Sequence, residues 1–352
     1  MSVDTIEVRP DERFDQARLA DYLRGKLPGS DQPLTVRQFG GGVANLTYLL
    51  SYGELEYVLR RPPLGPVAQS AHDMRREYRV LSVLHQAYPF APRAFLHGDD
   101  PSIIGAEFVV MERRHGLVVR RKLPEAYAGQ PQAARQMSLA LVEALADLHA
   151  VDYAAIGLGD LGRPAGFVER QIEGWYRRWQ AAKTDDVPEM DAVYEWLRGH
   201  VPASAQFSLV HNDFKLDNAM LAADNPGRIV AIFDWDMATL GDPLSDVGTL
   251  LAYWTEPGDP AYQQALSMMP VGPLGFASRA ELVERYAERS GRRVEHINFY
   301  RTLGIFRVVV IIAQIYIRFV RGQTQDQRFA ALGPAIRPMA LAAQAAALAA
   351  SL

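Results

Sequence analysis

The chain contains no cysteine, which excludes disulfide bonds, thiolate metal ligands and cysteine nucleophiles together. Any metal chemistry must therefore use oxygen atoms or histidine. The chain also lacks a large excess of either charge, because 37 lysines and arginines stand against 41 aspartates and glutamates, for a net charge of -4. We therefore expect neither nucleic acid nor a membrane as a partner.

Long apolar runs are scarce as well. The most apolar interior segment, Ile305 to Ile317, is interrupted by Arg307 and Gln314. It is shorter than the roughly 20 residues that cross a bilayer, so we expect a buried helix. The N-terminus carries acidic residues instead of a basic and then apolar run, which predicts no secretory signal and a cytoplasmic location. The alanine-rich end, Met339 to Leu352, predicts a terminal helix.

The length of the chain indicates two lobes. A chain of 352 residues with 49% hydrophobic content can bury a large core and is longer than most single domains. Glu107 to Glu112 is typical of a strand, and apolar periodicity stops directly after it. We therefore expect an N-terminal lobe of residues 1–112 and a C-terminal lobe of residues 113–352.

The segment from His211 to Asn218 carries the polar groups that a phosphoryl transfer needs. Asp213 can accept the proton of a substrate hydroxyl, and Lys215 would lie near the transferred phosphoryl group. Asn218 can ligate a metal, and Asp234, at the end of the next apolar run, can hold that metal on the nucleotide phosphates. The histidine itself is expected to pack and hydrogen-bond within the loop.

A hairpin would explain the spacing of these metal ligands. Residues 219–222 and 228–233 read as two short strands, with turn residues between them. A turn centred near Asn225 would place Asn218 opposite Ile232, about 7–8 Å diagonally from Asp234. Two oxygen ligands at that separation can share Mg²⁺ with substrate phosphates. The alternative is that these are ordinary turn residues. Against it, the apolar run would deliver the carboxylate to the edge of a core, where an unpaired charge is costly.

These motifs resemble the aminoglycoside phosphotransferase family of kinase-like enzymes. The resemblance rests on the loop, on Asp234-Trp235-Asp236 and on Gly241 to Asp246. Gly40 to Tyr48 and Tyr57 to Pro63 resemble, more narrowly, the branch with kinase-like domains fused to acyl-CoA dehydrogenases. The match covers residues 35 to 255, and the chain ends too early for a dehydrogenase domain, so we expect a stand-alone member.

The resemblance implies an α+β, bilobal protein-kinase-like fold. It has a small, nucleotide-binding N-terminal lobe (1–112) with an antiparallel sheet and a helix. The larger, mainly helical C-terminal lobe (113–352) would carry the catalytic loop and a helical substrate-binding insertion. Backbone groups near Met111 would hold the adenine edge. The glycines at 40–42 could bring N–H groups to the phosphates, with Gly42 as the candidate. They could equally make a simple hairpin turn, since they do not spell the kinase glycine pattern.

The nucleotide side of the site can also be derived from strand and helix geometry. Val58 and Arg60 share a strand face, suited to an adenine ring and to phosphates respectively. Protein kinases place a lysine where Arg60 stands. Arg61, on the opposite face, is a competing candidate, although solvent exposure is expected there. Glu77 lies on the apolar stripe of a predicted helix and needs a partner, so we predict an Arg60–Glu77 ion pair.

The acceptor should be a small molecule. Asp242 and Pro243 follow Asp236 within a few residues, which leaves little room for a peptide platform. In the family, the substrate sits under helices inserted before the loop, here residues 166–199, where acids and bases nearly balance. A polycationic aminoglycoside would want a stronger acidic surplus. An amphipathic alcohol or a hydroxyacyl thioester fits better. For any single aromatic residue of this insertion, core packing is an equal alternative.

The sequence therefore supports an ATP- or GTP-dependent and Mg²⁺-dependent phosphotransferase with a small-molecule hydroxyl acceptor, and it leaves a homodimer open. The alternatives are a catalytically silent nucleotide-binding module and an aminoglycoside kinase proper. Asp213, Asn218 and Asp234 together favour the enzyme, because a degenerate kinase usually loses at least one of them.

Overall fold

The structure is a computed structural model that describes residues 5–40, 45–63, 73–203, 206–272, 274–324 and 327–349. The chain divides into two compact units. The continuous N-terminal part of the first unit ends at His115, whereas the expected boundary was at Glu112. The first unit also includes two later segments of the chain, which one boundary could not have assigned to it. Its parts are Met1–His115, Ile156–Leu158 and Val230–Ala238, and the second unit comprises Gly116–Ala155, Gly159–Ile229 and Thr239–Leu352.

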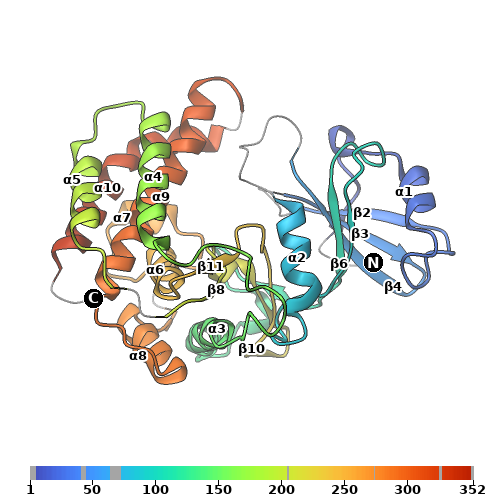
Figure 1. The fold of residues 1–352 in the computed structure, drawn as a ribbon, viewed down its shortest axis with the longest axis horizontal. Coiled ribbons are helices and arrows are strands. Elements are labelled where there is room, and N and C mark those ends of the chain that lie inside the picture. The colour runs from blue at the N-terminus through green and yellow to red at the C-terminus, as the bar shows by residue number, and fades with distance from the viewer. Residues whose placement is uncertain are drawn as a thin grey trace. The chain divides into compact units, whose positions relative to one another are not determined.

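The first unit is built on an antiparallel sheet. Its strands are β1 (Thr5–Ile6), β2 (Thr35–Phe39), β3 (Leu46–Tyr52), β4 (Leu55–Arg61), β5 (Ala94–Gly98) and β6 (Phe108–Glu112), with helices α1 (Gln16–Leu23) and α2 (Met74–Leu84). The sheet order is β1-β2-β3-β4-β6-β5 (Figure 1). The strand predicted at Glu107 to Glu112 is present as β6 and begins one residue later, and Val58 and Arg60 lie on β4 as predicted.

The two faces of this sheet carry different residues, because successive side chains of a strand point to opposite sides. Tyr48, Leu50 and Tyr52 of β3 join the apolar core that includes Leu19 and Leu23 of α1. Helix α2 contacts β5 and β6. It begins after Asp73, whose side chain accepts a hydrogen bond from the Arg76 amide. Its buried residues recur at helical spacing: Met74, Glu77, Val80, Leu81 and Leu84.

The second unit is mainly helical. Its helices are α3 (Ala133–His149), α4 (Phe167–Ala182), α5 (Pro188–Gly199), α6 (Leu244–Tyr253), α7 (Ala261–Leu266), α8 (Arg279–Ser290), α9 (Ile297–Val320) and α10 (Ile336–Leu348). Its short strands are β7 (Leu117–Val118), β8 (Ser208–Val210), β9 (Ala219–Ala222), β10 (Asn225–Ile232, whose last residues belong to the first unit) and β11 (Thr239–Gly241). Helices α4, α5, α9 and α10 pack together (Figure 1).

Helices α6 and α9 approach each other closely enough to require glycine. A Cβ atom on Gly248 would lie 2.2 Å from the carbonyl oxygen of Tyr300, and one on Gly304 would lie 2.5 Å from the carbonyl oxygen of Gly248. The two backbones are therefore in contact at this crossing. The crossing fixes where the next turn of α9, with Arg307, lies relative to α6.

Helix α9 is longer than the sequence-based expectation for the apolar segment Ile305 to Ile317. The apolar segment was expected to be too short for a membrane span, but the helix has 24 residues. It is the one helix in the described part of the chain that is long and apolar enough, by length and composition, to cross a bilayer, and 56% of its most apolar window is buried. The first seventeen residues lie against α4, α6 and α10 in large part, which accounts for their composition. The expectation of a buried core helix therefore holds for this part of α9.

Two further boundaries differ from expectation. The terminal helix α10 begins at Ile336 and ends at Leu348, with Ala349 extended. The hairpin of β9 and β10 turns at Ala223 and Asp224 rather than around Asn225, because β10 already begins at Asn225.

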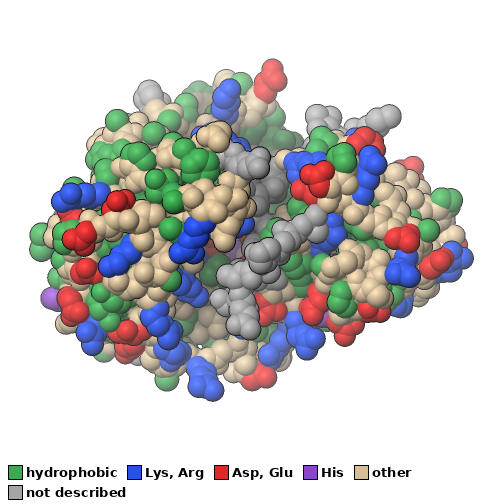
Figure 2. Space-filling model, turned by 90° about the horizontal axis from the view of Figure 1, so that it is seen from above, with side chains coloured by type: hydrophobic (Ala, Val, Ile, Leu, Met, Phe, Trp, Pro, Cys, Tyr) green, Lys and Arg blue, Asp and Glu red, His purple; other side chains and the backbone are tan. Residues whose placement is uncertain are grey.

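On the surface, side chains of both charge signs are interspersed over the face in Figure 2.

Candidate active site

The catalytic loop begins where β8 ends. His211 is fully buried, its backbone N–H donates to Asp246 Oδ2 at 2.6 Å, and its ring lies edge-on to Phe214. The backbone N–H of Asp213 donates to the His211 Nδ1 atom at 3.2 Å. The histidine thus shapes the loop from within, as expected.

The carboxylate of Asp246, on α6, binds the backbone of this loop. Besides the His211 amide, its carboxylate accepts the Asn212 N–H at 2.7 Å, and the ring of the buried His149 lies 3.3 Å away. Asn212 adopts a left-handed backbone with φ 65°, a conformation that asparagine tolerates better than most residues. Burial alone would raise the pKa of Asp246, but its hydrogen bonds and the histidine rings outweigh burial and lower it. The sequence showed this residue only as part of the family motif.

Asp213, Lys215 and Asn218 converge within the second unit. The Lys215 Nζ atom lies 3.0 Å from Asp213 Oδ2, and the Asn218 Nδ2 atom donates to the same oxygen at 3.1 Å and to the Asp213 carbonyl oxygen at 2.9 Å. Burial by itself would lower the pKa of Lys215, but the Asp213 carboxylate raises it above its usual value. The carboxylate is therefore held in place by a permanent cation and an amide.

Arg60 joins two carboxylates within the first unit. Its Nη1 atom lies 2.9 Å from Glu77 Oε1, and its Nη2 atom donates to Asp234 Oδ1 at 2.6 Å. The predicted Arg60–Glu77 ion pair is therefore present. One guanidinium uses two separate nitrogens for two acids, which the single ammonium of a lysine could not reproduce.

Both partners of this pair are buried. Glu77 is fully buried, and burial raises its pKa to about 7 against the opposing charge of Arg60. Burial would lower the pKa of Arg60, but Glu77 and Asp234 raise it more, so the guanidinium keeps its charge. An isolated charge at this depth would be strongly unfavourable, and the pair removes that cost only while both members are present.

Asp234 leaves β10 in an unusual backbone conformation. Its φ is 72°, in the left-handed region where a residue with a side chain is uncommon. The next residue, Trp235, is fully buried and donates its indole N–H to the Ile232 carbonyl oxygen at 2.8 Å. Asn45 donates to the Asp236 carboxylate at 3.4 Å. The buried tryptophan thus anchors a strained turn that presents two carboxylates.

Arg61 was expected to be solvent-exposed, and that expectation is wrong. Only 2% of it is exposed, because it lies on the α1 side of the sheet. Its guanidinium donates to the Ile104 carbonyl oxygen at 2.9 Å and to the Tyr48 hydroxyl at 2.8 Å, and it lies over the Phe14 ring. Arg61 is therefore a structural residue, and Arg60 is the arginine that faces Glu77.

Two predicted nucleotide contacts keep their status as predictions. Gly42 lies outside the described residues. Met111 is buried within β6, in register with Val58 of β4 and Ala94 of β5. Its place next to Val58, the proposed adenine neighbour, is compatible with a role near the base.

The residues proposed for Mg²⁺ have suitable donor chemistry. Asn218 uses its amide N–H₂ group on Asp213, which leaves its carbonyl oxygen as the atom for a cation. Asp234 supplies a carboxylate. The register that placed Asn218 opposite Ile232 depended on the wrong turn position, and the two ligands belong to different units, so their sharing of one ion stays a prediction. The described residues contain no group of three or more acidic or histidine side chains that could hold a metal alone. Mg²⁺ bound through one or two protein oxygens and substrate phosphates requires no such group.

Comparison with known proteins settles the family. The model of the phosphotransferase enzyme family matches residues 35–281, more than two-thirds of the chain. The chain belongs to this family. Its fold is the kinase-like α+β fold. A solved structure from Ralstonia eutropha, described as a candidate aminoglycoside phosphotransferase, is similar with a TM-score of 0.80 and 31% identity, over 95% of this chain and 98% of that one.

Other relatives are longer or more distant. Acyl-CoA dehydrogenase family member 11 of Gallus gallus is 33% identical over 350 residues, which cover 96% of this chain and 44% of that protein. The chain thus spans less than half the length of this curated relative. The aminoglycoside phosphotransferase APH(4)-Ia in complex with AMP-PNP and hygromycin B has a TM-score of 0.58 at 18% identity, over 90% of this chain and 95% of that one, and shows the fold alone.

In this member of the phosphotransferase enzyme family, a cavity with a largely apolar wall lies beside Lys215. Lys215 lines it together with Asp217 and with the side chains of Tyr253, Trp254, Met268 and Met269. The ammonium of Lys215 lies 4.9 Å from the centre of the Tyr253 ring. An apolar part of an acceptor could therefore lie within reach of the catalytic loop.

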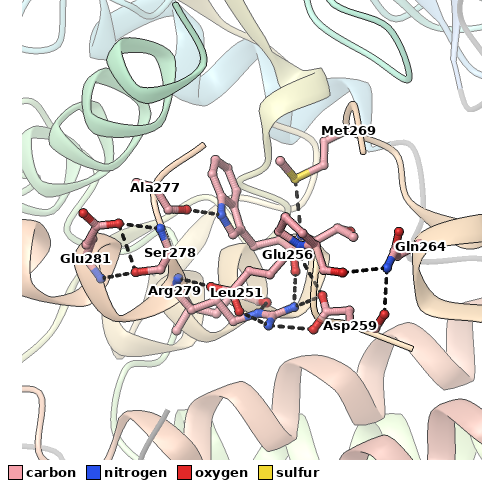
Figure 3. Close-up of polar contacts among 12 residues, drawn as sticks. Leu251, Glu256, Asp259, Gln264, Met269, Ala277, Ser278, Arg279 and Glu281 are labelled. Atoms are coloured by element: carbon pink, nitrogen blue, oxygen red, sulfur yellow. Dashed lines mark hydrogen bonds and ion pairs between the residues drawn. The ribbon is translucent and has the colours of Figure 1, made fainter. Parts of the chain in front are cut away.

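A polar network fixes the wall of this cavity. The guanidinium of the buried Arg279 donates to Glu256 at 2.7 Å, to Asp259 at 2.9 Å and to the carbonyl oxygen of Trp254 (Figure 3). Met269, on the loop closed by this network, accepts the Thr255 N–H through its sulfur at 3.3 Å. The loop that carries the two methionines is thus held at its base, and no sequence pattern indicated this.

Proposed function

We propose that this phosphotransferase is an ATP- and Mg²⁺-dependent kinase that transfers the terminal phosphoryl group to a hydroxyl of a small amphipathic molecule. The observation that carries the proposal is the Asp213 carboxylate, held by Lys215 at 3.0 Å and by Asn218 at 3.1 Å. A carboxylate oriented in this way can receive the proton of an alcohol.

Phosphoryl transfer forms one bond to the terminal phosphorus and breaks another. The acceptor oxygen forms a bond to the terminal phosphorus, and the bond between that phosphorus and the β–γ bridging oxygen breaks. ADP leaves with the electron pair, and the hydroxyl proton passes to Asp213. Lys215 keeps its charge beside the base and can stabilise the negative charge that develops on the transferred group. Mg²⁺, when bound, would neutralise phosphate charge, with Asn218 and Asp234 as its protein ligands.

The nucleotide part of the proposal rests on the first unit. Arg60 is buried, permanently charged and positioned by Glu77, which suits it to a nucleotide phosphate. AMP-PNP in the structure of APH(4)-Ia supports an adenine nucleotide, with GTP as the alternative. Use of ATP agrees with the cytoplasmic location proposed from the sequence.

The acceptor part of the proposal rests on the second unit. The cavity beside Lys215 is walled by a tyrosine, a tryptophan and two methionines, which favours an acceptor with an apolar portion. The name of the curated relatives, acyl-CoA dehydrogenases, supports an acyl chain on that acceptor. We therefore place hydroxyacyl compounds first and aminoglycosides second.

The test follows ATP consumption by the full chain against a panel of hydroxyacyl compounds, simple alcohols and kanamycin, with products identified by ³¹P NMR. We expect Asp213→Asn to lower transfer by about 10²–10⁴-fold and to retain ATP binding. Asp224→Asn, on the exposed hairpin turn, is the matched control and should leave transfer unchanged. ATP binding without any phosphorylated product would establish the silent module instead. Phosphorylation of kanamycin alone would establish the aminoglycoside kinase.

A further inference from the structure

The turn that follows Lys215 carries two polar residues with different surroundings. Residues Leu216–Asn218 form one turn of 3₁₀ helix, η3. The Asn218 side chain donates to the Asp213 carboxylate at 3.1 Å. Asp217, one residue earlier, lines the cavity beside Lys215. The turn therefore places one polar side chain on the proposed base and another acidic residue in the wall of the proposed acceptor cavity.

The Asp217 carboxylate lies among the other polar groups of this cavity wall. Burial alone would lower the pKa of Lys215, and Asp217 is one of the groups that raise it. Burial is the largest cause that raises the pKa of Tyr253, and the charge of Asp217 acts on the same hydroxyl group. The Lys215 ammonium lies 4.9 Å from the centre of the Tyr253 ring. The carboxylate is therefore within electrostatic reach of the two other polar side chains that line the cavity.

The same carboxylate has acceptor capacity for a bound molecule. Burial is the largest effect on the pKa of Asp217 and raises it, which shows that water solvates the group poorly. The hydrogen bond that lowers this pKa comes from the backbone N–H of Asp217 itself. An ionised carboxylate offers about four acceptor sites, and one N–H occupies a single site. A donor on a bound molecule can therefore replace the hydration that this carboxylate has lost.

The charges that act on Asp217 favour a neutral donor over a cationic one. Lys215 and Arg120 are positive, and Asp213 is negative, so together with Asp217 these four charges balance. The remaining residues of the wall are apolar: Leu216, Leu250, Trp254, Met268 and Met269. An ammonium group would bring an uncompensated charge into these surroundings, which is costly. A hydroxyl or an amide N–H forms a charge-assisted hydrogen bond without that cost.

We propose that Asp217 accepts a hydrogen bond from a second, neutral donor of the acceptor, a hydroxyl or an amide N–H, while the reacting hydroxyl meets Asp213. The apolar part of the acceptor would lie along Met268 and Met269. This inference rests on the proposed kinase function and names its substrate class as diols and hydroxyamides with an apolar chain. Asp217 is then a residue that determines acceptor specificity, whereas Asp213 remains the base.

Direct binding tests the inference without turnover. Hexane-1,2-diol, hexane-1,3-diol and N-(2-hydroxyethyl)hexanamide would be titrated into the full chain and followed by NMR. Each is compared with the analogue in which a methyl group replaces the hydrogen of the second donor. At least one donor compound should bind about tenfold more tightly than its methylated analogue. Equal affinities within all three pairs would overturn the inference, and so would tighter binding of 2-aminohexan-1-ol than of any neutral compound.

Variants connect this preference to the carboxylate. Asp217→Asn keeps the size of the side chain and removes its charge, so the preference for the donor compound should fall below about threefold. Asp224→Asn, the same change on the exposed hairpin turn, should leave the preference unchanged. If Asp217→Asn does not fold, Asp217→Ser and the pairs measured on the wild type carry the test. A folded Asp217→Asn that keeps the full preference would show that Asp217 only balances the charge of Lys215.

Transfer separates this inference from the function beneath it. With ATP, the preferred donor compound should have a KM about tenfold below that of its methylated analogue, and this difference should vanish in Asp217→Asn. Equal KM values in the wild type would refute the role of Asp217 and leave the kinase standing. An equal loss of transfer to both compounds in Asp217→Asn would assign the residue to the positioning of Lys215 and refute the inference. A preference in binding, with no transfer to any alcohol, would refute the kinase and leave a hydrogen-bonding cavity of the second unit.

Discussion

The ion pair between Arg60 and Glu77 predicts how substitutions of the two residues change the free energy of unfolding. Glu77→Gln removes one of two carboxylates on the guanidinium, and Arg60→Gln removes the cation that both share. Breaking a buried pair by removing one partner costs about 3–5 kcal/mol of unfolding free energy. Arg60→Gln should cost more than Glu77→Gln, because it also leaves Asp234 without its 2.6 Å partner.

The losses of unfolding free energy in the two single variants should not be additive in the double variant. Once either member is gone, the second substitution removes no further pair, so the double variant should be more stable than the sum by about 1–3 kcal/mol. Urea unfolding of the four proteins measures this coupling, and calorimetry with Mg·ATP measures the same cycle for nucleotide binding.

Arg61 supplies the matched control. It is the neighbouring arginine, equally buried, but it bonds to Tyr48 and Ile104 on the other face of the sheet. The cycle of Arg61→Gln with Glu77→Gln should be additive within about 0.5 kcal/mol. If the Arg60 cycle is additive as well, the two residues do not act as a pair, and the reasoning is refuted.

Four other variants, one of them a control, test Asp234, Asp246 and the crossing of α6 and α9. Asp234→Ala should abolish Mg·ATP binding in calorimetry, without rescue by excess acceptor, whereas unchanged affinity would remove it from the metal site. Asp246→Asn should lower the free energy of unfolding by about 1–3 kcal/mol at neutral pH. The pKa of Asp246 is lowered in the folded protein. The ionised carboxylate therefore stabilises the fold above its unfolded pKa of about 3.9, and this stabilisation is lost as pH falls through the folded pKa. The thermal midpoint of Asp246→Asn should therefore change less with acid pH than that of the wild type. Gly304→Ala should lower the free energy of unfolding by more than about 1 kcal/mol through the 2.5 Å clash with α6. Gly174→Ala, whose Cβ would lie 3.8 Å from Arg178 Nη1, should be neutral or stabilising, and equal effects of the two variants would argue against the close crossing.

The sequence predicted the strands that carry Arg60 and Met111 and the Arg60–Glu77 pair, because each depends on short-range periodicity or on a spacing within one motif. It missed the turn of the β9–β10 hairpin, since a run containing asparagine, proline and glycine was read as turn although β10 begins at Asn225. It also missed the burial of Arg61, because alternation tells which residues share a face but not which face another element covers.

By itself, the sequence determined the chemistry available to this protein: no thiol, a carboxylate two residues after a histidine, an amide and a second carboxylate at the spacing of a phosphotransferase. Only the tertiary structure decided which charges meet. Asp246 reaches back to the loop across more than thirty residues, with 2.6 Å and 2.7 Å contacts to its backbone. Arg307, which the sequence showed only as an interruption of an apolar run, is buried and lines a cavity together with Asn212 of the loop. Such contacts depend on how α6 and α9 cross, and that crossing follows from two glycines whose proximity no local pattern reveals.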